Sequence, residues 1–195
     1  MASLELKSEH QQADIRRQIK SIRANLDPVY REAASEIIAD KVIRSNWFYS
    51  AKKIGCYLAT PSEVDTSSII LRAWMMKKRV FVPVVTKNFS MQFHEMKSNT
   101  DLYPNALGIY EPMHGNVLPA RELDIVITPL VAFDNALNRI GMGGGCFDRT
   151  FAFLKHRKFL FKPKLIGVAF ACQEIEKVIA NPWDIRLFHI VSDNQ

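Results

Sequence analysis

Cysteine is scarce in this chain of 195 residues, and the spacings that would let cysteine or histidine bind zinc are missing. The three cysteines, Cys56, Cys146 and Cys172, form no CxxC pair and are odd in number, which argues against a disulfide framework and against a zinc site. Cys56 and Cys172 lie in or beside apolar runs, so both are expected to be buried. Any bound metal ion is therefore expected to have oxygen ligands.

Long apolar runs are also missing. No stretch of about 18 apolar residues occurs, and the N-terminal MASLELKSEHQQ is polar, so we expect neither secretion nor a membrane span. A cytoplasmic protein is predicted. No repeat, composition shift or low-complexity linker divides the chain, and 48% of its residues are hydrophobic, which predicts one domain over residues 1–195.

Positive charge is in excess. The net charge of +6 is compatible with a nucleic acid, an acidic small molecule or no particular partner. Arg16, Lys20 and Arg23 share one face of the first predicted helix, because they are spaced by four and seven residues. Such a row is either a solvated helix face or a stripe that faces phosphate, and the spacing alone leaves both open.

Apolar periodicity predicts helices at 14–26, 30–43 and 67–78. The apolar side of the first is expected at Ile15, Ile19 and Ile22, and this helix should end near Asn25. Asp27 followed by Pro28 is a favourable N-cap and first-turn pair for the second helix. The inward-facing residues of the second helix are predicted to be Val29, Ala33, Ile37 and Val42.

Apolar segments between these helices predict strands. The predicted strands are 52–60, 79–85, 91–96, 123–133 and 164–170. Segments 79–85 and 123–133 are continuously apolar, which is typical of buried parallel strands. Strands that alternate with helices predict an α/β fold of the Rossmann-like kind, a mostly parallel sheet covered by helices on both faces. Ligands bind such sheets beyond the carboxyl ends of the strands, where PSEVDT, TPLVAFD and GMGGG could meet.

The segment RIGMGGGCFDRTFAFL holds four of the eight glycines of the chain within five positions. Phe147, Phe151 and Leu154 follow at helical spacing, so the glycines precede a helix. Main-chain N–H groups at a helix start can bind phosphate when side chains are absent. A tight strand-to-helix turn is the alternative explanation. The motif is neither GxxxxGK[ST] nor GxGxxG, because Cys146 occupies the last glycine position of the second pattern.

Five motifs in this order resemble the 5-formyltetrahydrofolate cyclo-ligase family, whose members are also called 5,10-methenyltetrahydrofolate synthetases. The motifs are YLATPSEVDT, RVFVPVV, the EP of IYEP, LDIVITPLVAFD and NRIGMGGGCFDRT. The likeness runs from about Ile15 to about Ile190. It implies conversion of 5-formyltetrahydrofolate to 5,10-methenyltetrahydrofolate with ATP and Mg²⁺. In that scheme the formyl oxygen attacks the γ-phosphate, and N10 then closes the ring with loss of phosphate.

The resemblance also implies the site residues. The ATP contacts would be Arg16, Arg139, Gly141, Met142, Gly143, Gly144, Gly145, Cys146 and Phe147. The catalytic residues would be Arg139 and Asp148, since guanidinium groups stabilise charge on a transferring phosphoryl group. The Mg²⁺ ligands would be Asp148 and Asp184, and the substrate contacts would be Leu58, Glu63 and Phe147.

Each acidic residue has a simpler explanation. Glu63 could be a turn residue before a helix, Asp148 could cap the helix or pair with Arg149, and Asp184 could be a surface carboxylate. The sequence also departs from the family, whose members commonly have two Tyr at the positions of Cys146 and Phe147. They commonly have Lys at the position of Gln12. These departures bear on the detailed ATP and folate contacts.

Two other functional classes compete with the ligase. A basic nucleic-acid-binding module would use the positive helix, but no RNP, KH or helix-turn-helix motif is present, and Phe81, Phe133 and Phe151 occupy core-like positions. Another phosphate-handling α/β enzyme, such as a sugar-phosphate isomerase, would need no ATP. We expect a monomer that acts on a small-molecule folate and binds neither nucleic acid nor membranes.

Overall fold

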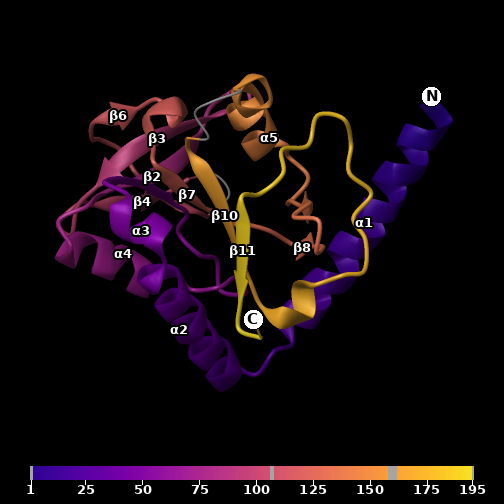
Figure 1. The fold of residues 1–195 in the computed structure, drawn as a ribbon, viewed down its shortest axis with the longest axis horizontal. Helices are drawn as coiled ribbons and strands as arrows, with labels where there is room; N and C mark the ends of the chain where they lie inside the picture. Colours follow the sequence, from indigo (N-terminus) through magenta and orange to yellow (C-terminus); the bar gives the residue numbers. More distant parts are fainter. Residues whose placement is uncertain (1, 106–107, 158–161, 195) are drawn as a thin grey trace.

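The computed structural model describes residues 2–105, 108–157 and 162–194. A seven-stranded sheet forms its centre (Figure 1). The strands are β1 (Lys53–Cys56), β2 (Arg79–Val85), β3 (Met91–Met96), β6 (Val117–Leu118), β7 (Ile125–Pro129), β10 (Lys164–Ala169) and β11 (His189–Ser192). Their order is β11-β10-β7-β1-β2-β3-β6. The first five of these run parallel, and β3 pairs antiparallel with both β2 and β6. The predicted mostly parallel α/β sheet is therefore confirmed.

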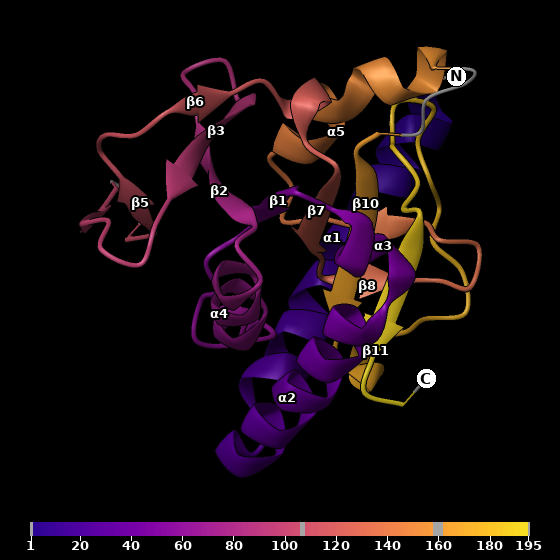
Figure 2. The same cartoon turned by 60° about the vertical axis from the view of Figure 1, so that its left-hand side comes forward.

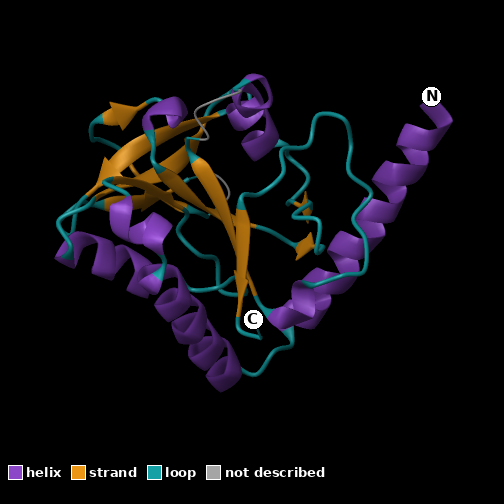
Figure 3. Cartoon of the chain, viewed as in Figure 1, coloured by secondary structure: helices purple, strands orange, loops and turns teal. Residues whose placement is uncertain are grey.

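Helices cover both faces of the sheet, as Figure 3 shows. The helices are α1 (Ala2–Ala24), α2 (Pro28–Arg44), α3 (Asn46–Ser50), α4 (Ser67–Met75) and α5 (Cys146–Phe151), with 3-10 turns η1 (Ala120–Glu122), η2 (Ala152–His156) and η3 (Ala171–Gln173). Helices α2, α3 and α4 pack on one core, which includes Ile38, Phe48 and Ile69. Helix α5 packs on a second core through Phe151, which is fully buried.

Two short hairpins complete the fold. Strands β4 (Leu102–Pro104) and β5 (Tyr110–Pro112) form a hairpin near β3 and β6, at the end of the molecule away from α1 (Figure 2). Strands β8 (Ala132–Phe133) and β9 (Arg139–Ile140) form the other. Helix α1 packs on this second hairpin through Ile19, which contacts a cluster that includes Ala132 and Ile140.

The second predicted helix is correct, but the prediction of its inward face is wrong. Asp27 caps α2 as expected and accepts hydrogen bonds from Val29 N and Tyr30 N. Val29 and Ile37 are 74% and 46% exposed, and Ala33 is also exposed. The buried residues of α2 are Ala34, Ser35, Ile38, Ala39 and Val42. The buried face therefore lies about one residue further along the chain, and Val42 is the single predicted inward residue that is buried.

Helix α1 begins at Ala2, well before the predicted start, and ends at Ala24 as expected. Ile22 is 40% exposed, so its predicted place on the apolar side is wrong. Arg23, one residue later, is only 3% exposed. It belongs neither to a solvated helix face nor to an open phosphate-facing stripe, the two explanations that the spacing had left open.

Several predicted elements are shorter in the structure. The predicted strand 123–133 divides into β7 and β8: β7 ends at Pro129, which has no N–H group to donate, the chain bends at Val131, and β8 pairs with β9. The helix after residue 67 ends at Met75, before the predicted Lys78. Strand 79–85 is fully buried only at its centre, residues 80–82. Cys56 is buried as expected, whereas Cys172 is half-buried.

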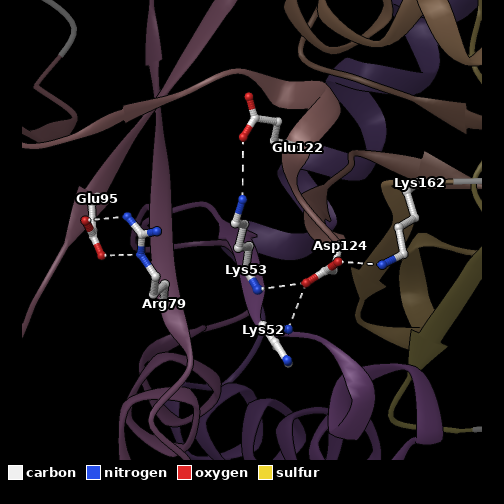
Figure 4. A network of polar contacts seen from close by, with 7 residues as sticks. All are labelled: Lys52, Lys53, Arg79, Glu95, Glu122, Asp124 and Lys162. Carbon is white, nitrogen blue, oxygen red and sulfur yellow. Dashed lines mark hydrogen bonds and ion pairs between the residues drawn. The ribbon is translucent and has the colours of Figure 1, made fainter.

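Two groups of polar contacts lie at the starts of β1, β2 and β7 (Figure 4). Arg79 donates to both carboxylate oxygens of Glu95, at 2.7 and 2.9 Å. Asp124 accepts from the backbone N–H groups of Lys52 and Lys53 and pairs with Lys162 at 2.7 Å. The hydrogen-bonded Arg79 guanidinium lowers the pKa of the Glu95 carboxyl to about 2. The two groups stabilise the amino-terminal edge of the sheet. Within the described chain, no helix is both long and apolar enough to cross a membrane.

Candidate active site

A cavity of about 870 Å³ lies beside the glycine run. Its lining includes the predicted site residues Arg16, Arg139, Gly141, Gly143, Gly145, Asp148 and Asp184. They come from α1, from β9 and the loop after it, from α5, and from the segment before β11. Figure 1 shows that this last segment runs beside α1, and the Gln12 side chain of α1 donates to Ile179 O at 2.8 Å. Residues from distant parts of the sequence therefore meet around one cavity.

The glycine run has two kinds of position. Gly143 and Gly145 have φ angles of 107° and 64°, a left-handed region that side chains rarely adopt. Gly141 and Gly144 have ordinary φ angles, and a Cβ at Gly141 would meet nothing within 4 Å. At Gly144 a Cβ would meet Cys146 Sγ at 3.5 Å, an ordinary contact. The turn therefore explains Gly143 and Gly145, but it does not explain why Gly141 and Gly144 lack side chains.

Arg139 and Asp148 form a partly buried ion pair at the start of α5. Arg139 Nη2 lies 2.9 Å from Asp148 Oδ1, and the Arg139 side chain is 4% exposed. The same oxygen accepts from Ile185 N at 2.9 Å, and Arg139 donates to Ile185 O. Asp148 thus pairs with Arg139. The simpler explanation that Asp148 pairs with Arg149 is therefore wrong. Asp148 Oδ2 accepts no hydrogen bond from the described residues.

Asp184 faces the same cavity and is half-buried. Burial raises the pKa of its carboxyl, and the negative charge of Asp148 raises that pKa further. Its Oδ2 accepts from Asn181 N at 2.7 Å. Asp148 and Asp184 therefore place two carboxylates of like charge at one cavity, with Asp148 Oδ2 available as a ligand. Such a donor set suits a hard cation. No cluster of three His, Cys, Asp or Glu side chains suited to a metal occurs in the described parts of the chain.

Arg16 reaches the glycine run from α1. Its Nε donates to Gly141 O at 2.8 Å, and its Nη2 donates to Gln12 Oε1 at 2.7 Å. Gln12 is 6% exposed and also bonds Ile179 O. Gln12 is therefore a buried link that orients Arg16, at a position where the family commonly has Lys.

The other predicted ATP contacts lie along the same run. Met142 is 55% exposed, and Cys146 is half-buried. The Phe147 ring stacks on Phe151 with centroids 6.0 Å apart, and the Arg139 guanidinium lies 5.9 Å from its centroid. Phe147 thus packs between the second core and the arginine of the cavity.

Leu58 and Glu63, the predicted folate contacts, do not line this cavity. Both are half-buried, and they follow β1 at the carboxyl edge of the sheet. The Glu63 carboxylate accepts from Thr60 N at 2.9 Å. The structure thus separates the predicted site residues into a glycine-run cavity and a Glu63 turn, which we define as residues 60–64.

Sequence reasoning missed further cavity residues. They include Arg149, Lys155, His156 and Trp183. Arg149 donates to Gly144 O and, at 3.2 Å, to Phe89 O, so it ties the glycine run to the turn between β2 and β3. Position could have identified Arg149, since it follows Asp148 directly. Lys155 and His156 carried no comparable motif. They line the cavity because the chain changes from the α-helix α5 to the 3-10 turn η2 before them.

The fold and the site together define a class of protein: an α/β protein with a cavity that arginine and aspartate line beside a glycine run. Residues 8–193 match the 5-formyltetrahydrofolate cyclo-ligase family, and the chain belongs to this family. The 5-formyltetrahydrofolate cyclo-ligase of Haemophilus influenzae is 37% identical over 182 residues, which are 91% of this chain and 95% of that protein. The cyclo-ligase of Escherichia coli is 34% identical, over 91% of this chain and 97% of its own length.

Solved structures agree with the family assignment. The NMR structure of Aquifex aeolicus 5,10-methenyltetrahydrofolate synthetase superposes with a TM-score of 0.80 at 27% identity, covering 94% of this chain and 90% of that one. A 5,10-methenyltetrahydrofolate synthetase from Mycoplasma pneumoniae has a TM-score of 0.74 at 22% identity, over 93% of this chain and 98% of its own. The second likeness supports the fold alone.

Proposed function

We propose that this chain catalyses the ATP-dependent cyclisation of 5-formyltetrahydrofolate to 5,10-methenyltetrahydrofolate, with release of ADP and phosphate. Family membership over residues 8–193 supports this activity. One observation assigns the proposal to particular residues: in the glycine-run cavity, Gly141, a glycine that the turn does not need, lies beside Arg16, Arg139 and Arg149. Neither alternative, a sugar-phosphate isomerase or a nucleic-acid-binding module, is favoured by the family.

ATP would occupy the glycine-run cavity. Its volume of about 870 Å³ falls within the range of about 300–1,000 Å³ that small-molecule sites span. Arg16 and Arg149 lie at opposite ends of the run, bonded to Gly141 O and Gly144 O. Their guanidinium groups would face phosphate oxygens, and the open backbone at Gly141, where a Cβ would meet nothing within 4 Å, leaves room for close approach. The cationic lining suits a polyphosphate better than a neutral ligand.

Mg²⁺ would be held by Asp148 and Asp184, with phosphate oxygens and water completing its coordination. The uncommitted Oδ2 of Asp148 and the raised pKa of Asp184 fit this role. When bound, the ion would neutralise charge on the phosphate groups. Arg139 would act beside it, because its ion pair with Asp148 and its bonds to Ile185 hold the guanidinium in a fixed position.

Phosphoryl transfer demands positioning more than covalent chemistry from the protein. The formyl oxygen of the folate would attack the γ-phosphorus as the bond to ADP breaks. N10 would then close the ring as phosphate leaves with the former formyl oxygen, and N10 loses its proton. Glu63 would accept hydrogen bonds from pterin N–H groups, with Leu58 and Phe147 as apolar contacts. A monomeric, cytoplasmic enzyme of one domain stays our prediction.

The test is formation of the methenyl absorbance band in a mixture of the protein, Mg-ATP and 5-formyltetrahydrofolate. We expect the band to appear at a rate proportional to enzyme concentration and to require ATP. Released ADP should equal methenyl product one to one. If folded protein produced no methenyl absorbance, the result would contradict the proposed activity.

A further inference from the structure

The Glu63 turn is held more firmly than a surface turn needs to be. Tyr57 Oη, on a side chain that is 5% exposed, donates to Val64 O at 2.9 Å, directly after Glu63. Arg31 donates to Pro61 O at 2.7 Å. Glu63 N also bonds Thr60 O at 2.9 Å. Turns commonly lie in solvent and tolerate movement, so a turn that side chains grip on both sides indicates a required position for the residue within it.

Arg23, on α1, also bonds to the Glu63 turn. Its Nη2 donates to Ser62 Oγ at 3.2 Å, immediately before Glu63, and its Nη1 donates to Leu130 O at 3.4 Å, just beyond β7. Arg23 is only 3% exposed. It therefore connects three segments: the first helix, the turn after β1 and the end of β7.

Burying this cation is costly, because its two hydrogen bonds go to uncharged oxygens. Arg23 forms no ion pair with an acidic group anywhere in the described ranges, and its buried Nε has no hydrogen-bond acceptor there. A buried charge without a paired acid is strongly unfavourable, and an apolar residue would stabilise such a position better. A fold that keeps the cation there indicates a role other than stability.

The contacts of Arg23 with Ser62 and Leu130 indicate that role, and the electrostatics of Tyr57 agree with it. Burial raises the pKa of the Tyr57 hydroxyl, the charge of Glu63 raises it further, and the charge of Arg23 lowers it, so all three groups lie within electrostatic reach. An arginine fork can bond two separate acceptors in a fixed geometry, as Arg23 does with Ser62 Oγ and Leu130 O. Lysine, a point charge on a flexible stem, holds two such acceptors less rigidly.

We propose that Arg23 is a positioning residue for Glu63: it fixes the Glu63 turn against the end of β7 so that the carboxylate meets the folate. This inference rests on the proposed function of Glu63. Helix α1 then serves both parts of the site, since Arg16 bonds the glycine run and Arg23, seven residues or about two turns later, bonds the Glu63 turn.

The test compares Arg23→Met, Arg23→Lys and Ser62→Ala with wild type. Ser62→Ala removes one acceptor of Arg23 and keeps the buried cation. Amide hydrogen exchange of the ligand-free protein follows residues 60–66 and residues 141–145 separately. Initial rates give KM for 5-formyltetrahydrofolate and KM for ATP. Arg44→Met is the matched control, because Arg44 pairs with Asp40 on the exposed side of α2.

For Arg23→Met we expect exchange at residues 60–66 to accelerate about tenfold or more, with residues 141–145 unchanged. KM for the folate should rise about tenfold and KM for ATP less than about twofold, since a charge-assisted contact is lost at one part of the site alone. Arg23→Lys should recover part of this loss, and Ser62→Ala should raise KM for the folate about threefold. Arg44→Met should change neither.

A double variant tests whether Arg23 acts through Glu63. If it does, Arg23→Met combined with Glu63→Gln should raise KM for the folate no further than Glu63→Gln alone. Additive effects would overturn the inference, and so would equal rises in both KM values. If Arg23→Met does not fold, unchanged exchange at residues 60–66 in Ser62→Ala overturns it. Absent turnover in wild type would contradict the proposed function instead, and the exchange data would still decide the role of Arg23.

Discussion

The glycine-run cavity and the Glu63 turn differ in how their shapes are maintained. The cavity is open, and charged side chains and bare backbone line it. The Glu63 turn is half-buried, and from inside the protein Arg23 bonds its Ser62 side chain while Tyr57 bonds its backbone at Val64 O. A flexible, highly charged ligand suits the first region, whereas a rigid heterocycle with N–H donors suits the second. Under the proposed function, the two regions would bind two substrates by different means, cations beside bare backbone for ATP and a positioned carboxylate for the folate.

The largest expected effect comes from Asp148→Asn in the cavity. The change removes the partner of buried Arg139 and an oxygen proposed for Mg²⁺, so turnover should fall by about 100- to 1,000-fold. Steady-state rates across a magnesium titration measure this loss, which added Mg²⁺ should not restore. Asp40→Asn, which removes an exposed ion pair on α2, is the control and should retain full turnover. An Asp148→Asn enzyme with near-normal turnover would contradict the role of Asp148.

Glu63→Gln should have the next largest effect and should separate the two regions. Loss of a charged hydrogen-bond acceptor costs about 2 kcal/mol, which weakens folate binding about 30-fold. Affinity for ATP should stay near that of wild type, because Glu63 does not line the glycine-run cavity. Fluorescence titration with 5-formyltetrahydrofolate and calorimetry with ATP measure the two affinities. Comparable losses for both ligands would mean that the regions are not separate.

Substitutions of the glycines should have smaller effects, all within the glycine-run cavity region. Gly144→Ala should weaken ATP binding by about tenfold and leave stability nearly unchanged, because its φ angle is ordinary and its Cβ would meet only Cys146 Sγ at 3.5 Å. Gly145→Ala should instead destabilise the fold by about 1 kcal/mol or more, since its φ is 64° and its Cβ would lie 3.3 Å from Arg149. Calorimetric titration and thermal unfolding distinguish the two. Unchanged ATP affinity in Gly144→Ala would assign the glycines to the turn alone.

The smallest effect on activity should come from the amino-terminal edge of the sheet. The bonded Arg79 guanidinium lowers the folded-state pKa of Glu95 from 4.5 to about 2, so its contribution to stability is present above pH 4.5 and is lost as pH falls toward 2. Glu95→Gln should therefore unfold more easily at neutral pH, with the difference from wild type narrowing between pH 4.5 and 2. Urea unfolding across this range measures it. A change in either KM would show that this edge is not independent of the site.

Much of the fold was predictable because apolar strands and helical periodicity agree along the chain. Strands 53–56, 79–85 and 91–96 fall where continuous or alternating apolar segments predicted them. The inward face of α2 was not predictable to the residue, since adjacent apolar rows such as Ile37 and Ile38 compete and only tertiary packing selects one. The division of the strand 123–133 depended on pairing of Phe133 with Arg139, a contact that local sequence does not encode.

The candidate site was likewise predictable only in part. The glycine run, Arg139, Asp148 and Asp184 carry recognisable motifs, and the structure gathers them around one cavity. Their ligands stay predictions. Arg23 carried no such signal, because a charged residue at helical spacing resembles a solvated face until the partner segments fold against it. Its burial depends on Ser62 and Leu130, 39 and 107 residues away.

The most direct test of the two-region account is an initial-rate grid over both substrates for wild type, Gly144→Ala and Glu63→Gln. The account predicts methenyl formation by wild type, a raised KM for ATP alone in Gly144→Ala and a raised KM for 5-formyltetrahydrofolate alone in Glu63→Gln. Both KM values rising together in each variant would contradict it, as would a wild-type enzyme that forms no methenyl product.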